Sequence, residues 1–127
     1  MARITGIGGV FLKARDPKAL ASWYRDVLGL PVEEWNGAQL RFADDAGAPE
    51  HAYAVWALFP ADTGYFGDGT QSTMVNFRVD DLDGLLASLR AAGCTVDPKV
   101  SDEGFGRFGW ITDPEGNRVE LWQPPAE

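Results

Sequence analysis

The sequence has one cysteine, one histidine and no apolar run long enough to cross a membrane. The lone Cys94 cannot form an internal disulfide, and its place after a predicted helix suggests a small buried apolar side chain. A membrane-spanning helix needs about 18 or more apolar residues in a row. The N-terminus also lacks a long apolar segment with a small-residue cleavage site, so nothing predicts export. We therefore expect a cytoplasmic protein.

Basic residues are also scarce. The chain has 11 lysines and arginines against 19 aspartates and glutamates, which gives a formal net charge of −8. Nucleic acids and anionic membrane surfaces bind clustered basic side chains, so neither is an expected partner. A neutral or cationic small molecule fits this charge better. The length of 127 residues predicts a single domain, 1–127, with a buried core.

The first half of the chain reads as one strand, one helix and three more strands. Asp16 and Pro17 are a helix-start signal, and Gly29 is placed to end that helix. Asn36-Gly37 is a strong hairpin signal between two short strand-like runs. The expected elements are strands at 4–13, 31–35, 38–43 and 51–58, with a helix over 17–28.

The second half repeats this order after a glycine-rich linker, 61–73. A helix starts after Asp80 and Asp81 and ends at Gly93, and a tight turn fills 113–117. The expected strands are 74–79, 95–100, 107–112 and 118–122. Repeat unit 1 thus covers about 4–60 and repeat unit 2 about 74–124. Neither sheet can bury its inner face alone, so we predict an α+β fold in which two βαβββ repeats form a cup-shaped mixed sheet around a cleft.

Three stretches carry a family resemblance: 16–30, 77–81 and 113–122. They resemble the vicinal oxygen chelate superfamily, which includes glyoxalase I, extradiol dioxygenases, fosfomycin-resistance enzymes and bleomycin-binding proteins. The resemblance covers nearly the whole chain. It implies the fold, whereas the activity varies widely among proteins that share this scaffold.

The resemblance implies a divalent metal held by His and Glu side chains from the inner strands of both repeats. Carried over position by position, the four ligand slots fall at Gly9, Trp56, Met74 and Glu120. Only Glu120 keeps the residue type, and a catalytic site needs about three protein ligands. His51 lies at the start of its strand and, by alternation, on the face opposite Trp56, so we expect a surface residue. We predict no metal and no cofactor.

Alternation along the strands predicts which side chains line the cleft. Glu120 is the only acid among them, and we expect Lys13 or Arg78 to pair with it. Without a partner or solvent, its pKa would rise and it would be a candidate general acid or base. The predicted ligand-binding residues are Phe11, Lys13, Trp56, Leu58, Met74, Asn76, Arg78, Phe108, Trp110 and Trp122. The same residues could instead simply fill the core.

Two glycine- and aromatic-rich loops, 60–69 and 104–110, could cover the cleft or pack their rings on the surface. Three functions follow. The first is a metal-free protein that binds a small aromatic or cationic ligand by stacking and cation–π attraction. The alternative is a metal-independent lyase or isomerase in which Glu120 moves a proton and Arg78 or Lys13 stabilises negative charge. The third is a metal-dependent, glyoxalase-like enzyme. A homodimer is expected in each case.

Overall fold

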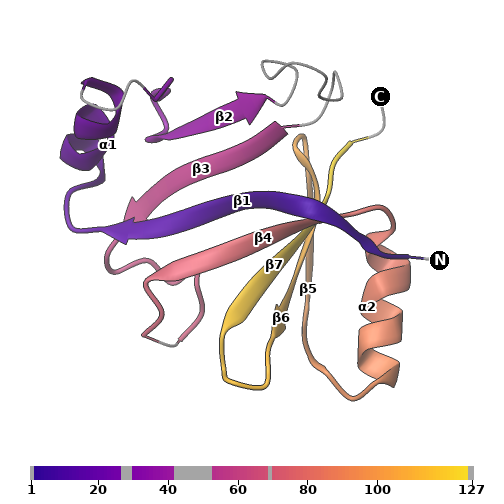
Figure 1. Cartoon of the computed structure of the whole chain (residues 1–127). Helices are drawn as coiled ribbons and strands as arrows, with labels where there is room; N and C mark the ends of the chain where they lie inside the picture. The colour runs from indigo at the N-terminus through magenta and orange to yellow at the C-terminus, as the bar shows by residue number, and fades with distance from the viewer. Residues whose placement is uncertain (1, 27–29, 42–52, 69, 126–127) are drawn as a thin grey trace. The chain divides into compact units, whose positions relative to one another are not determined.

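The computed structural model describes residues 2–26, 30–41, 53–68 and 70–125. The chain divides into two compact units, Gly9–Thr73 on the one hand and Met1–Gly8 with Met74–Glu127 on the other. Strand β1 (Ile4–Ala14) passes from one unit into the other (Figure 1). No helix in the described part of the chain is long and apolar enough to cross a membrane.

The unit Gly9–Thr73 contains the second half of β1, α1 (Pro17–Asp26), β2 (Gly37–Arg41) and β3 (Tyr53–Pro60). Its strand order is β2-β3-β1, with β2 antiparallel and β1 parallel to β3. Asp16 caps α1 as predicted, because its Oδ1 accepts from the Ala19 N–H at 3.1 Å. Helix α1 packs on one face of these strands through Ala14, Ala21 and Leu58, joined by Leu12, Leu20, Val32 and Trp56.

The predicted strand at 31–35 is wrong. Asn36 has a φ of 63° and forms the expected turn, but the residues before it lie outside the strands. One bond from the Glu33 N–H to the Gly37 carbonyl closes this turn at 2.8 Å. The antiparallel partner of β2 is β3 instead. The turn signal was thus correct, and the ladder partner comes from farther along the chain.

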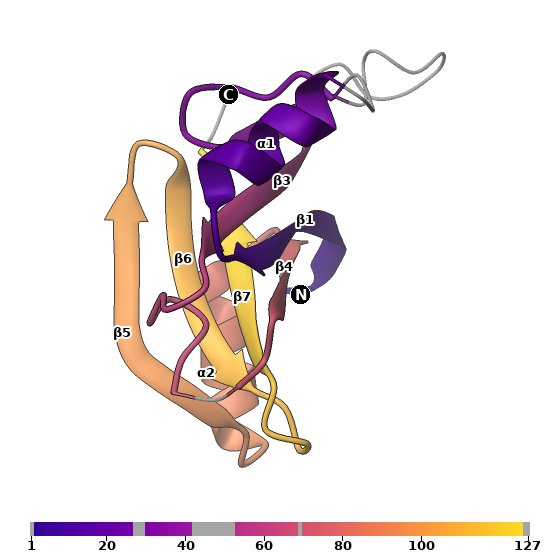
Figure 2. The same ribbon diagram turned by 90° about the vertical axis from the view of Figure 1, so that its left-hand side faces the viewer.

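The other unit contains β4 (Thr73–Val79), α2 (Leu82–Ala91), β5 (Thr95–Glu103), β6 (Gly106–Thr112) and β7 (Arg118–Gln123). The first half of β1 neighbours β4, and the order continues β4-β7-β6-β5. Figure 2 shows β5, β6 and β7 side by side with α2 behind them. The α2-facing core consists of Val79, Leu82, Leu86 and Leu121, with Phe77, Leu85, Leu89, Val96, Ile111 and Val119 around it.

Helix α2 ends as the sequence predicts, at Gly93 with a φ of 84°. The Cys94 N–H donates back to the Leu89 carbonyl at 2.9 Å. Cys94 itself is exposed, so the prediction of a buried apolar side chain is wrong. The residue follows the left-handed glycine, where the chain has already left the α2-facing core.

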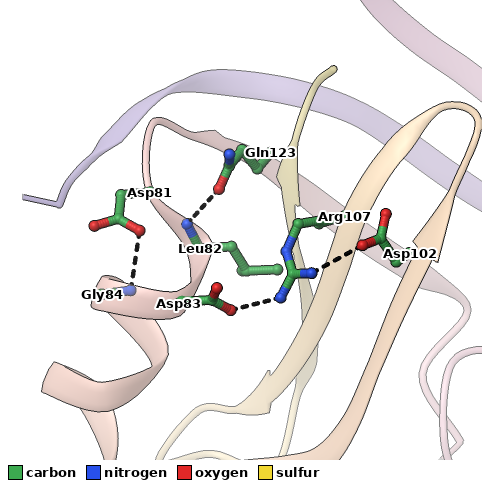
Figure 3. Close-up of polar contacts among 7 residues, drawn as sticks. All are labelled: Asp81, Leu82, Asp83, Gly84, Asp102, Arg107 and Gln123. Carbon is green, nitrogen blue, oxygen red and sulfur yellow. Dashed lines mark hydrogen bonds and ion pairs between the residues drawn. The ribbon is translucent and has the colours of Figure 1, made fainter. Parts of the chain in front are cut away.

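The N-terminus of α2 is tied to two strands by side chains (Figure 3). The Asp81 side chain accepts from the Gly84 N–H at 3.1 Å, and Gln123 Oε1 on β7 accepts from the Leu82 N–H at 2.7 Å. Arg107 on β6 donates from Nη2 to Asp83 at 2.6 Å and from Nη1 to Asp102 at 2.9 Å. These contacts fix the helix against the strands that carry the candidate site.

Replacing Asp81 by alanine should lower the free energy of unfolding by about 1 kcal/mol, the usual cost of losing an N-cap acceptor. Gln123 still accepts from the helix, so α2 should persist. Urea unfolding followed by circular dichroism measures the change. The exposed Asp62→Ala serves as the matched control. If both variants lose equally little, Gln123 alone is sufficient to cap α2.

Candidate functional site

A buried carboxylate lies at the centre of the unit that contains α2. Glu120 on β7 is 1% exposed, and its register partners are Asn76 on β4 and Trp110 on β6. Asn76 Nδ2 donates to Glu120 Oε1 at 2.6 Å, and Trp110 Nε1 donates to Glu120 Oε2 at 2.9 Å. Each oxygen of the carboxylate thus accepts one N–H hydrogen bond. Neither donor was the predicted partner.

This row lies on the face of the sheet opposite α2. The residues that follow Asn76 and Glu120 in their strands, Phe77 and Leu121, belong to the α2-facing core. Side chains alternate along a strand, so Asn76 and Glu120 point the other way. The same alternation places Met74, Arg78, Phe108 and Trp122 on this face, and Met74 and Trp122 are buried.

A second row lies next to the first and is mostly aromatic. Arg78, Trp122 and Phe108 are register partners on β4, β7 and β6. The Phe108 and Trp122 rings are nearly parallel, with centroids 6.2 Å apart. Trp122 Nε1 donates to the Phe105 carbonyl at 2.8 Å, which ties the β5–β6 loop to this row. The face thus combines one carboxylate with stacked aromatic rings.

Two glycines of β1 make room for these side chains. A Cβ on Gly8 would overlap Asn76 Oδ1 and come within 2.9 Å of the Trp122 ring. A Cβ on Gly6 would contact the Arg78 guanidinium, whose Nη1 donates to the Ile7 carbonyl at 3.0 Å. The bare backbone of β1 therefore lets Asn76 and Arg78 lie flat against it.

The unit Gly9–Thr73 carries the remaining predicted residues in two separate environments. Phe11 and Phe59 rings lie 5.3 Å apart, and Phe59 also contacts Phe66 and Tyr65 of the linker. Lys13 Nζ lies 5.5 Å from the Phe66 ring centroid. Phe66 is completely buried, so within its own unit this linker loop packs its rings around Phe59.

Trp56 and Leu58 do not share this environment, and their predicted orientation is wrong. Both pack on the α1 side, where the Trp56 ring lies 4.4 Å from that of Tyr24. In the ladders, Leu12 pairs with Leu58 as Phe77 pairs with Leu121. The counterpart of Glu120 in the first repeat is therefore Ala57, and that of Trp122 is Phe59. Matching the prolines of the two strand ends had shifted the comparison by one residue.

The residues at the family's ligand slots do not fit a divalent ion. Gly9 and Ala57 supply no donor side chain, and a Met74 thioether does not suit a hard cation. Both Glu120 oxygens already accept N–H groups. Across the described residues, no group of three His, Cys, Asp or Glu side chains is placed to hold a metal.

Two cations flank the indole that holds Glu120. Lys99 Nζ lies 5.8 Å and the Arg118 guanidinium carbon 5.3 Å from the Trp110 ring centroid. Arg118 Nη2 also donates to Asp97 at 3.1 Å. The Lys99 backbone N–H and then Arg118 hold the pKa of Asp97 below its usual value. None of these three residues was predicted: Asp97 and Lys99 come from an irregularity in β5, and Arg118 lies on β7.

The missed residues differ in how visible they are in the sequence. Ala57 and Phe59 follow from aligning Leu58 with Leu121, so the signal was present. Gly6 and Gly8 stand at alternate positions of one strand, which hints at a close approach without naming what approaches. His51 lies outside the described residues.

Comparison with known proteins places the chain. The model of the family described as glyoxalase-like domain matches residues 9–122. No curated protein matches. Among solved structures, Streptomyces coelicolor methylmalonyl-CoA epimerase in complex with 2-nitronate-propionyl-CoA is 19% identical over 98% of this chain and 100% of that chain, with a TM-score of 0.70.

Two further solved structures share the fold. A glyoxalase/bleomycin resistance protein/dioxygenase superfamily member from Vibrio splendidus is 15% identical over 97% of this chain and 99% of that chain, with a TM-score of 0.56. The Mn(II)-bound glyoxalase from Novosphingobium aromaticivorans is 25% identical over 97% of this chain but 40% of that chain, with a TM-score of 0.58. The predicted α+β fold class is thus confirmed, and the chain belongs to the family described as glyoxalase-like domain.

Proposed function

We propose that this chain is a metal-independent binding protein for a small aromatic or cationic molecule, with Glu120 as the anchor. The observation that carries the proposal is a carboxylate that is 1% exposed and oriented by two neutral donors, Asn76 and Trp110. A buried carboxylate attracts a cationic group strongly, because few water molecules screen it. The adjacent Phe108 and Trp122 rings offer a surface for stacking.

The chemistry of the family's ligand slots supports binding without a metal. Those slots hold Gly9, Ala57 and Met74, which leaves Glu120 as the only oxygen donor among them. The net charge of −8 further favours a cation over an anion.

Homodimerisation remains a prediction, which sedimentation equilibrium would test.

The expected result is that Glu120→Gln weakens binding of an aromatic cation by roughly tenfold or more, the usual worth of a charge-assisted hydrogen bond. Benzamidinium is the probe, and neutral benzamide of nearly the same shape is its partner. Isothermal titration calorimetry gives the dissociation constants, and tryptophan fluorescence reports contact with Trp122. Glu115→Gln, an exposed residue of the 113–117 turn, is the control and should bind like the parent chain.

Two outcomes would contradict the proposal. In the first, neither probe binds the parent chain at millimolar concentration. In the second, benzamidinium binds, but Glu120→Gln and Glu115→Gln retain the same affinity. Loss of benzamidinium binding with retained benzamide binding would instead confirm that the charge of Glu120 is the recognised group.

The enzymatic alternative uses the same residue differently. A lyase or isomerase would need a Glu120 oxygen that can take up and release a substrate proton. Here Oε1 and Oε2 each accept one N–H, which orients the carboxylate. We favour electrostatic anchoring, because two donors hold the carboxylate in a fixed orientation next to the row that contains Phe108 and Trp122. Substrate turnover that disappears in Glu120→Gln would reverse this order.

A further inference from the structure

We infer that Asp97, Lys99 and Arg118 are positioning residues for Glu120, acting through the Trp110 indole. The inference rests on the proposed role of Glu120 as the ligand anchor. Lys99 and Arg118 lie near the Trp110 ring, and Asp97 binds Arg118.

Strand β5 pairs irregularly with β6. Val96 pairs with Ile111 and Val100 pairs with Gly109, so three residues of β5, 97–99, stand opposite the single residue Trp110 of β6. Bulges of this kind redirect side chains and are frequent beside functional sites. Asp97 stabilises the extra length, because its Oδ1 accepts from the Lys99 N–H at 2.9 Å. The bulge thus places Lys99 beside the Trp110 indole and Asp97 against Arg118.

Two positively charged side chains lie near the Trp110 indole. Lys99 comes from the bulge itself, whereas Arg118 lies on β7, two residues before Glu120 and on the same face. Both cations lie within 6 Å of the Trp110 ring centroid, the range of a cation–π contact. Asp97 binds Arg118 at 3.1 Å and so fixes its guanidinium against the ring.

The Trp110 indole is hydrogen-bonded to the Glu120 carboxylate. Trp110 is 3% exposed, and its one polar atom, Nε1, donates to Glu120 Oε2 at 2.9 Å. Two cations beside the ring restrict its rotation, so Lys99 on β5 and Arg118 on β7 together set the direction of this N–H. A nearby positive charge also polarises the indole N–H and strengthens its donation. Glu120 is therefore held on one side by Asn76 and on the other by an indole that β5 and β7 immobilise.

The test compares Arg118→Met with Arg118→Lys, which keeps a cation near the ring. The first readout is hydrogen exchange of the Trp110 indole N–H by NMR, assigned with Trp110→Phe. Exchange in Arg118→Met should be about tenfold faster or more, while Arg118→Lys stays close to the parent chain. The second readout is the benzamidinium dissociation constant, which should rise about 2- to 30-fold in Arg118→Met, the range expected for a lost cation–π contact.

Asp97→Asn and Asp102→Asn form a matched pair. Both acids lie on β5 and bind an arginine: Asp102 binds Arg107 of the adjacent β6, whereas Asp97 binds Arg118 of β7, which lies over Trp110. The amide of Asp97→Asn can still accept from the Lys99 N–H, so the bulge should survive. We expect faster indole exchange and weaker benzamidinium binding in Asp97→Asn, and neither change in Asp102→Asn.

The two readouts separate this inference from the proposed function. Unchanged indole exchange in both Arg118→Met and Asp97→Asn would overturn the inference whatever binds. Faster exchange in those variants, with no benzamidinium binding by the parent chain, would uphold the fixing of the indole but overturn its role for a ligand, together with the proposed function. If Asp97→Asn and Asp102→Asn change indole exchange and benzamidinium binding equally, both ion pairs only stabilise the fold, and the inference is overturned.

Discussion

Glu120→Ala is expected to lower the free energy of unfolding by about 2–6 kcal/mol, because it strands two buried donors that each cost about 1–3 kcal/mol when unpaired. Asn76 Nδ2 and Trp110 Nε1 both donate to Glu120 and belong to residues that are 2% and 3% exposed. The truncated side chain also leaves a space at a buried position, which the surrounding sheet can only partly close. Urea denaturation followed by circular dichroism measures the loss.

Glu120→Gln is the control that separates charge from hydrogen bonding. The introduced amide can accept from Trp110 with its oxygen and donate with its nitrogen to Asn76, provided that the Asn76 amide flips to present Oδ1. Because that rearrangement restores both bonds, the free energy of unfolding should stay within about 1 kcal/mol of the parent chain. If Glu120→Ala proves as stable as Glu120→Gln, water satisfies the two donors and the row is not a closed network.

The Glu120→Ala and Glu120→Gln variants also distinguish a structural carboxylate from a ligand anchor. If the buried carboxylate only completes the core, Glu120→Ala should be less stable than Glu120→Gln, but Glu120→Gln should bind the ligand as tightly as the parent chain. An anchor would lose the aromatic cation in Glu120→Gln while the fold remains intact. Stability and affinity therefore separate the two interpretations that the sequence leaves open, a filled core and a binding site.

The sequence predicts much of this face, and the reason is local. Strand alternation alone places Asn76, Arg78, Glu120 and Trp122 together, since each strand has a helix-facing partner row rich in leucine and valine. The same rule failed for β3. There the two repeats were matched at Pro60 and Pro124, whereas the ladders match Leu58 with Leu121. A slip of one residue moves every side chain to the other face, so Trp56 and Leu58 were assigned to the wrong side.

Other features depend on contacts between distant parts of the chain, which local patterns do not encode. Asn36-Gly37 predicts a turn, but whether 31–35 pairs with β2 depends on the competing strand β3. The donors to Glu120 lie 44 and 10 residues away along the chain, and Trp110 appeared only as an aromatic near the cleft. The charged residues of the β5 bulge have the pattern of surface side chains, because no neighbouring residue in the sequence indicates the irregular pairing of β5 with β6.

The second large effect is expected at β1. Gly8→Ala should lower the free energy of unfolding by about 1–3 kcal/mol, the usual cost of overpacking a buried position. The new Cβ overlaps Asn76 Oδ1 and approaches the Trp122 ring to 2.9 Å, and backbone pairing keeps β1 from moving away freely. Displacing Asn76 also weakens its bond to Glu120. Thermal or urea unfolding gives the stability, and the benzamidinium dissociation constant should rise in parallel.

Gly64→Ala is the matched control, because a Cβ there meets no atom within 4 Å. That substitution should be neutral or slightly stabilising, since it reduces the entropy of the unfolded chain. The Asn76→Ala background tests the cause directly. If the overlap with Asn76 carries the penalty, the two substitutions should couple by about 0.5–3 kcal/mol, and Gly8→Ala should cost less once the amide is gone. Strict additivity would assign the penalty to Trp122 or to the strand itself, and the bare stretch of β1 would then serve the aromatic row rather than the carboxylate.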